Sequence, residues 1–331
     1  MPLIGALPAS STSLTKATHN RMYHPPDDQF VAKMHRMYGD IGKQWCDNLP
    51  MHLAQLADQW NVHLGPTFTL SFNYVCEATH RDDGRPLVIK TGAPTPEFMG
   101  ELTMHRHYAG RGAVRCLATD AEKYAVLLER VYPGTRLLDA VTDDDEATTI
   151  VANLIRTSLY PAADDLHIPS IYEWADDALS HAVRICTTRH DLIDINHIYR
   201  AQAIFADNPQ TTPYLALHGD LHHGNILRDA YGWCIIDPQG VRGNAAYECT
   251  AFLRNPQPQL SQHADCVGLT IKRITIMSEI IGMPAREIAM WNYAAMVMSA
   301  WWCFQADKEI NQKELTLVDV FYAVWQHYQS R

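Results

Sequence analysis

The run LHGDLHHGNIL (residues 217–227) decides how this chain is understood, because it packs three histidines, an aspartate and an asparagine into eleven residues. A second aspartate, Asp237, closes the run CIID twelve residues after Asn225. Imidazoles beside carboxylates could form a zinc site. The same residues could form a loop for phosphoryl transfer in which the histidines take no part in the chemistry. The two interpretations predict different chemistry.

The residues that follow this run predict a β-hairpin. Apolar residues at 226–227 and 234–236 flank DAYG (229–232), whose composition is that of a tight turn. A hairpin brings its outer ends together, so Asn225 and Asp237 are expected at one open end. Asp220 would lie on the loop that leads into that end. Carboxylate and amide oxygens suit Mg²⁺ better than Zn²⁺.

Phosphoryl transfer also needs a cation on the nucleotide phosphates, which a lysine from a neighbouring strand can supply. Lys90 closes the apolar run LVIK (87–90) and is the natural candidate. Glu97 or Glu101, on the helix expected next, could pair with it. The two glutamates are four residues apart and share a helix face, so their spacing does not choose between them.

The zinc alternative leaves Lys90, Asn225 and Asp237 without a purpose, so phosphoryl transfer is preferred. His218 is then expected to be a structural residue that bonds the loop backbone. His222 and His223 are expected to fill the loop, with one of them near the phosphates.

Composition limits the class of protein. A chain of 331 residues with 47% hydrophobic and 19% charged residues is typical of a soluble enzyme of two lobes or domains. The formal net charge of −10 argues against a nucleic-acid partner. The eight cysteines contain no CxxC, which favours a reducing cytoplasm. The apolar run at 288–304 is too short for a bilayer and predicts a buried helix, so no membrane association is expected. No obligate protein partner is evident.

The apolar spacing also predicts the order of the elements along the chain. Helical spacing is seen at 30–38 and continues through the apolar residues between 45 and 60, and Pro50 is expected in the first turn of a second helix. Alternation over 67–78 predicts strands with a turn near 71–73. Further elements are expected as follows: a turn at 82–84, a strand at 87–90, a helix at 96–109, a strand at 124–130, and a mostly helical remainder from about 139 with short apolar runs at 214–217 and 233–236.

With these motifs in this order, the chain resembles the aminoglycoside phosphotransferase family, and most closely its aminoglycoside 6-phosphotransferase (streptomycin kinase) and hydroxyurea kinase branch. The similar stretches run from about residue 45 to residue 302 and include PLVIKTG, AVLLERVYPGTRL, LHGDLHHGNIL and WCIIDPQGVRG.

The resemblance implies an α+β, protein-kinase-like fold of two lobes. A small β-rich N-lobe, with N-terminal helices and an ATP-binding sheet, would span 27–131. A larger, mainly helical C-lobe with the catalytic and metal-binding loops would span 132–331. Residues 1–26 would form a flexible N-terminal arm.

The resemblance also implies roles for individual residues. Asp220 becomes the catalytic base, and Asn225 and Asp237 become the Mg²⁺ ligands. Lys90 binds the phosphates of ATP, and Glu101 is its ion-pair partner.

The connection Glu129-Arg130-Val131 corresponds to the family's hinge, whose backbone holds the adenine. The GxGxxG loop of protein kinases is absent, and only the turn at 69–73 could cover the phosphates.

Residues 139–194 hold twelve acidic side chains against three arginines, so this segment carries −9 of the net charge. In the resembled family this part of the large lobe forms part of the wall of the acceptor pocket. Carboxylates there would attract a guanidino or amino sugar. Asp176 and Asp177, beside Trp174, are candidate acceptor contacts, and Glu248 is another. The run at 143–146, in contrast, looks like the start of a helix.

We therefore expect a cytoplasmic, ATP-dependent kinase that phosphorylates a hydroxyl of a cationic, aminoglycoside-like acceptor of the streptomycin type. Hydroxyurea, or a choline-like or sugar-like metabolite, is the alternative acceptor. A nucleotide-binding pseudokinase scaffold is the alternative outside the enzymes. The presence of both metal ligands and a base argues against it, because a scaffold has no physical need for them.

Overall fold

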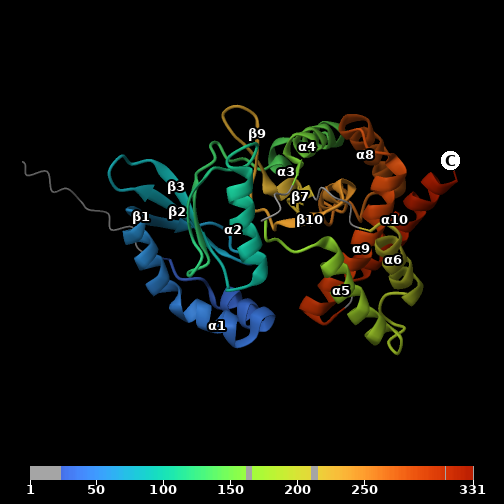
Figure 1. Ribbon diagram of the computed structural model, residues 1–331, viewed down its shortest axis with the longest axis horizontal. Helices are drawn as coiled ribbons and strands as arrows, with labels where there is room; N and C mark the ends of the chain where they lie inside the picture. The colour runs from blue at the N-terminus through green and yellow to red at the C-terminus, as the bar shows by residue number, and fades with distance from the viewer. Residues whose placement is uncertain (1–23, 162–165, 210–214, 310, 331) are drawn as a thin grey trace, which may run out of the picture.

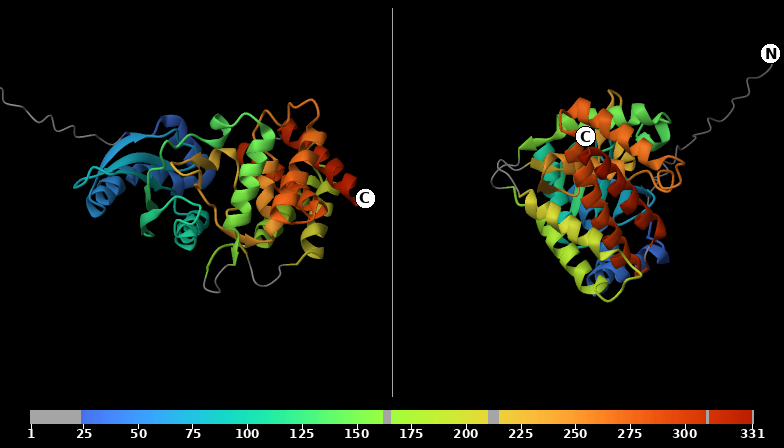
Figure 2. Two further views of the ribbon diagram at one scale, coloured as in Figure 1. Left: turned by 90° about the horizontal axis from the view of Figure 1, so that it is seen from above. Right: turned by 90° about the vertical axis from the view of Figure 1, so that its right-hand side faces the viewer.

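The computed structural model describes residues 24–161, 166–209, 215–309 and 311–330. The arm expected over residues 1–26 therefore lies almost entirely outside the described residues. An N-lobe that contains a sheet and a mainly helical C-lobe lie side by side along the long axis of the molecule (Figures 1 and 2). The expected α+β class and two-lobed, protein-kinase-like arrangement are confirmed.

The N-lobe is built on a five-stranded antiparallel sheet of order β1-β2-β3-β5-β4. Alternate residues of β2 are buried, as expected for a strand with one face against the core. Helix α1 packs on one face and α2 on the other. The elements of this lobe are α1 (Asp28–Gln59), β1 (Val62–Thr67), β2 (Tyr74–His80), β3 (Pro86–Thr91), α2 (Pro96–Tyr108), β4 (Cys116–Asp120) and β5 (Ala125–Glu129).

The position of the first helix break differs from the expectation. Pro50 lies inside α1, and the non-helical residue is Gly39, with φ 59° and ψ −140°. Only glycine adopts this part of conformational space without strain, so the kink forms there. Trp45, Leu49 and Leu53 then bury one continuous helical face against the sheet, and this burial outweighs the hydrogen bond that Pro50 cannot make.

Two strands were also misjudged. Residues 68–73 are not a strand, whereas β1 lies earlier than predicted and β4 was not predicted at all. Both missed strands form the edges of the sheet. Edge strands are only half covered, and β4 has no fully buried residue, so neither shows a clear alternation.

The C-lobe packs around α9, which contains the apolar run at 288–304. Trp291 and Trp301 are fully buried in it, which confirms a core helix. Among the described residues, no helix is long and apolar enough to cross a membrane. The elements of this lobe are α3 (Leu137–Ala140), α4 (Asp144–Ser158), β6 (Tyr160–Pro161), α5 (Ile171–Cys186), α6 (Ile195–Asp207), β7 (Leu215–Leu217), η1 (His223–Asn225), β8 (Ile226–Arg228), β9 (Trp233–Ile235), β10 (Val241–Gly243), η2 (Ala245–Cys249), α7 (Thr250–Leu253), α8 (Cys266–Ile281), α9 (Ala285–Asp307) and α10 (Gln312–Gln329).

The two lobes are joined by the connection between β5 and α3. The expected boundary between residues 131 and 132 falls within this connection. The bounds of the two lobes stay a prediction.

Candidate active site

A buried lysine joins the two lobes through its ion pairs. Lys90 Nζ, at the end of β3, lies 2.7 Å from Glu101 Oε2 on α2 and also contacts Asp237 of the C-lobe. The Lys90 and Glu101 side chains are each only 6% exposed. Burial alone would lower the pKa of Lys90, but the carboxylates of Asp237 and Glu101 outweigh it and raise the pKa. Lys90 is therefore held as a cation at the lobe junction.

The structure also separates the two glutamates that the sequence left equivalent. Glu101 is buried against Lys90, whereas Glu97 is exposed one turn earlier on the same helix. Helix α2 stands between the sheet and the C-lobe, and this position turns only one of the two carboxylates toward Lys90 (Figure 1).

Two glycines allow α2 to approach the Asp237 loop. A Cβ on Gly100 would lie 2.7 Å from the carbonyl oxygen of Gln239. A Cβ on Gly240 would lie 2.5 Å from Met104 Cγ, and Gly240 has a φ of 76°. Backbone contact this close needs residues without a side chain. The helix can thus bring Glu101 to Lys90.

The hairpin places Asn225 and Asp237 at one open end, as expected. Ile226 pairs with Ile235 across β8 and β9, and the Ile236 N–H donates to the Asn225 carbonyl at 3.0 Å. Asp237 adopts a left-handed conformation, with φ 62°. Aspartate tolerates this conformation better than most residues, and such backbone strain often accompanies function.

Asn225 and Asp237 offer oxygen atoms of the kind that Mg²⁺ prefers. The Asn225 amide nitrogen donates to the Asp220 carbonyl at 2.9 Å, so the amide oxygen is the atom that could serve as a metal ligand. Burial acts to raise the pKa of Asp237, but the Lys90 ammonium outweighs it and holds the pKa below its ordinary value. The donor set therefore fits Mg²⁺.

The loop that carries Asp220 is anchored by His218. His218 Nε2 donates to the Ile236 carbonyl at 2.8 Å, and its Nδ1 accepts the Asp220 N–H at 3.2 Å. Burial lowers the pKa of His218 to about 4, so the ring is neutral. The expectation of a structural histidine is confirmed, and this ring ties the Asp220 loop to the Asp237 loop.

Glu248 has a structural role rather than the acceptor contact that was suggested for it. Its side chain is buried, and its two oxygens accept the N–H groups of His218 and Gly219 at 2.9 and 3.2 Å. Burial raises the pKa of Glu248 to about 7, although both N–H groups act against this shift. Sequence proximity to Asp237 was misleading, because the side chain turns inward to satisfy the loop backbone.

The Asp220 carboxylate lies between two further side chains. Arg254 Nη2 is 3.4 Å from Oδ1, and His222 Nε2 is 3.6 Å from Oδ2. Sequence reasoning missed Arg254. It follows Asp220 by 34 residues, and no local pattern connects the two.

The histidines do not assemble a zinc site. His218 bonds the loop, His222 stands beside Asp220, and His223 stacks on Phe252 with ring centroids 4.1 Å apart. Within the described ranges, no three histidine, cysteine, aspartate or glutamate side chains are grouped to hold a metal.

An apolar surface lies beside the expected hinge. Val88, Val131 and Ile236 are only partly buried and pack onto the cluster formed by Leu128 and its neighbours. These side chains come from the sheet, the connection and the C-lobe hairpin, and sequence reasoning did not single out Val88 or Ile236. Partly exposed apolar side chains of this kind suit one face of a flat heterocycle.

Most of the acidic segment is used structurally. Asp143 caps α4, which confirms that a helix starts at the run 143–146. Other members have these partners: Asp139 with Arg136, Asp144 with Arg273, Asp145 with Lys272, Asp191 with Arg189, and Asp194 as the cap of α6. Asp164 and Asp165 lie outside the described residues.

Asp176 and Asp177 stay exposed on α5, next to Trp174. A Cβ on Gly219, the neighbour of Asp220, would lie 3.7 Å from the Trp174 ring. Asp177 follows Trp174 by three residues and shares its helix face. Asp176 points along another face, where its carboxylate accepts a bond from Ser180. Asp177 is therefore the better placed of the two.

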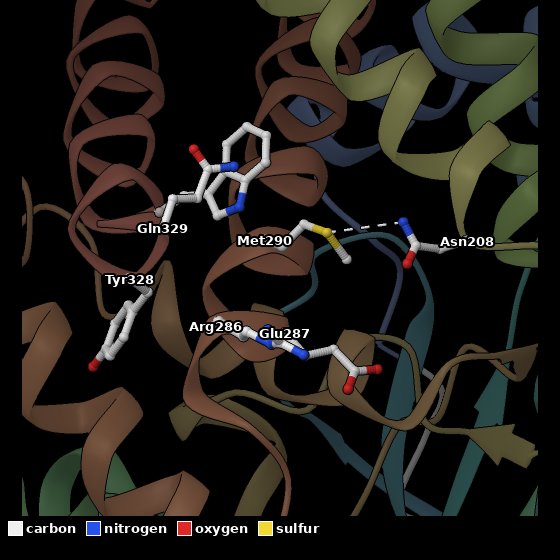
Figure 3. A pocket seen from close by; sticks show the side chains of 7 residues that line it. Asn208, Arg286, Glu287, Met290, Tyr328 and Gln329 are labelled. Atoms are coloured by element: carbon white, nitrogen blue, oxygen red, sulfur yellow. Dashed lines mark hydrogen bonds between the residues drawn. The ribbon is translucent and has the colours of Figure 1, made fainter. Parts of the chain in front are cut away.

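A separate hollow of about 680 Å³ lies in the C-lobe, between the ends of α6 and α10 and the start of α9. Figure 3 shows Asn208, Met290, Tyr328 and Gln329 around it. None of the residues expected at the active site lines this hollow.

The sequence matches the family model described as "Aminoglycoside/hydroxyurea antibiotic resistance kinase" over residues 66–307. It is 27% identical to a streptomycin 6-kinase of Streptomyces glaucescens, across 83% of this chain and 89% of that protein. It is 25% identical to a hydroxyurea phosphotransferase of Kitasatospora aureofaciens, across 88% of this chain and 84% of that protein.

The fold is similar to that of solved kinases of small molecules. The choline kinase of Streptococcus pneumoniae superimposes with a TM-score of 0.55 and 13% identity, over 85% of this chain and 98% of that chain. At this identity the likeness concerns the fold alone.

Replacing Glu248 by glutamine should remove a component of the pH dependence of stability. The folded-state pKa of Glu248 is raised from its ordinary 4.5 to about 7, so its contribution is present below about pH 4.5 and lost as the pH rises through 7. The wild-type free energy of unfolding, relative to Glu248→Gln, should therefore fall by about 3 kcal/mol over this range. Urea unfolding at several pH values measures it, and a difference that stays constant with pH would contradict it.

Proposed function

Because the chain belongs to the aminoglycoside/hydroxyurea antibiotic resistance kinase family, we propose that it transfers the γ-phosphoryl group of ATP to a hydroxyl of a cationic, aminoglycoside-like acceptor of the streptomycin type. The observation that supports this most is the meeting of Lys90, Glu101 and Asp237 across the lobes, beside the loop of Asp220 and Asn225. A lysine, a base and two oxygen ligands at one junction are the parts that phosphoryl transfer needs.

The nucleotide lies between the lobes in this proposal. The backbone of Glu129 to Val131 binds the adenine, against the apolar surface of Val88 and Ile236. Lys90, oriented by Glu101, binds the phosphates. Asn225 and Asp237 hold Mg²⁺, which when bound neutralises the charge that develops on the phosphates.

Asp220 orients the acceptor hydroxyl and takes its proton as the oxygen attacks the γ-phosphorus, and ADP leaves. Because little covalent chemistry falls to the protein, the rate gain comes mostly from positioning and electrostatics. Arg254 places its guanidinium 3.4 Å from Oδ1 and helps to orient this carboxylate.

The acceptor end of the site supports a cation. Trp174 borders the Asp220 loop and Asp177 shares its helix face, so an aromatic ring and a carboxylate are available to a guanidino or amino group. Hydroxyurea is the second candidate acceptor, on the strength of the hydroxyurea phosphotransferase relative. We place the reaction in the cytoplasm, because all eight cysteines are free thiols.

Replacing Asp220 by asparagine should lower kcat by about 10²- to 10⁴-fold, the usual contribution of a general base, and leave ATP binding intact. The wild-type assay is ADP release with Mg·ATP against streptomycin, other aminoglycosides, hydroxyurea and small alcohols. Asp229→Asn, in the turn between β8 and β9, is the control and should behave as wild type. Substantial turnover by the Asp220 variant would contradict the assignment, and Mg·ATP binding without turnover on any acceptor would favour a pseudokinase scaffold.

Replacing Glu101 by glutamine should raise the KM for ATP by about tenfold, because a charge-assisted contact that orients Lys90 is lost. Glu97→Gln on the same helix is the matched control and should leave the KM unchanged. Steady-state kinetics with a fixed acceptor measures both. Equal changes of the KM for ATP in the two variants would show that Glu101 does not orient Lys90.

Replacing Asp177 by asparagine should raise the KM for a cationic acceptor by about two- to fivefold, in keeping with the strength of an exposed ion pair. The kcat of this variant should be unchanged. Asp176→Asn should change neither constant, because Asp176 faces away from Trp174. An effect confined to the Asp176 variant would reverse the assignment.

A further inference from the structure

His222 stands beside the proposed base and has no role in the proposed phosphoryl transfer. Its Nε2 lies 3.6 Å from Asp220 Oδ2, and its Nδ1 accepts the N–H of Gly224 at 2.9 Å. A Cβ on Gly224 would lie 2.8 Å from His222 Cε1, so a larger residue at 224 would displace the ring from this position. The orientation of this ring is therefore built into the loop.

The Gly224 contact determines which nitrogen of His222 carries the proton. Because Nδ1 accepts a peptide N–H, it must present its lone pair, and a neutral ring then carries its proton on Nε2. The N–H of Nε2 thus faces the Asp220 carboxylate.

His223, the next residue, shows that this arrangement is not general for the loop. Its ring stacks on Phe252, and neither of its nitrogens has a hydrogen-bond partner among the described residues. Only one of the two adjacent histidines is turned toward Asp220.

We propose that His222 is a positioning residue: its Nε2–H donates to Asp220 Oδ2 and, with Arg254 on Oδ1, fixes the plane of the carboxylate that meets the acceptor hydroxyl. The separation of 3.6 Å is longer than a formed hydrogen bond. Contacts of catalytic groups are often long in the free enzyme and shorten when substrates bind. The inference rests on the proposed role of Asp220.

Two variants separate the two nitrogens of His222. Asparagine places an oxygen near the position of Nδ1, so His222→Asn keeps the acceptor for Gly224 and loses the donor to Asp220. Glutamine places a nitrogen near the position of Nε2, so His222→Gln keeps the donor and loses the acceptor. A purely structural role at Gly224 predicts that the asparagine variant is the better enzyme, whereas positioning of Asp220 predicts the glutamine variant.

His263 provides a matched control. Its Nδ1 accepts the Asp265 N–H at 3.1 Å, the same local bond that His222 makes, on an exposed loop. His263→Asn should therefore be kinetically silent. Thermal unfolding of all three variants shows whether each one folds.

The expected result is that His222→Asn lowers kcat by about 10- to 100-fold, the range seen when a group that orients a functional side chain is removed. Its KM for ATP should be unchanged, and His222→Gln should recover most of kcat. Wild-type kcat in the asparagine variant, or a loss confined to the glutamine variant, would overturn the proposal. So would equal losses in both.

A second readout does not depend on turnover. Long-range ¹H–¹⁵N spectra of histidine-labelled protein should show His222 protonated on Nε2, with its resonances assigned from the His222→Asn variant. Asp220→Ala should shift the Nε2 resonance of His222 and leave that of His263 in place. An Nδ1-protonated ring, or no response to Asp220→Ala, would overturn the proposal. If the wild type phosphorylates no acceptor, the proposed function fails, and these spectra still decide whether His222 donates to Asp220.

Discussion

The buried contact of Lys90 with Glu101 and Asp237 is the interaction on which the site depends. It joins a strand, a helix and a C-lobe loop, and Lys90 and Asp237 are 147 residues apart in sequence. An ammonium group this buried is stable only with carboxylates beside it. The close approach of Gly100 to Gln239 and Gly240 and the left-handed backbone of Asp237 both serve to bring those carboxylates there.

A second constraint is the need to satisfy backbone polar groups in the Asp220 loop. The loop is buried and irregular, so its N–H groups need partners. His218 and Glu248 supply them, and each bonds the loop next to Asp220. The polar residues around Asp220 therefore divide into those that build the loop and those, such as Arg254 and His222, that stand at the carboxylate itself.

The same division applies to the acidic charge of the C-lobe. The concentration of carboxylates over 139–194 suggested an electrostatic wall for a cation. In the structure, many of these residues cap helices or pair with arginine and lysine, because helix N-termini and buried arginines need negative partners. A cationic acceptor would therefore meet one helix face, that of Trp174 and Asp177.

The sequence by itself determined the family, the two-lobed fold, the hairpin that brings Asn225 and Asp237 together, and Lys90 as the strand-end cation. These features follow from short motifs and local periodicity, which a linear chain displays directly. Only the tertiary structure decided between Glu97 and Glu101, turned Glu248 into a loop anchor, and placed Arg254 and His222 at Asp220. Each of these depends on how one segment packs against a distant segment or on how a loop orients its side chains. The spacing of residues along the chain determines neither the direction of a side chain nor its burial.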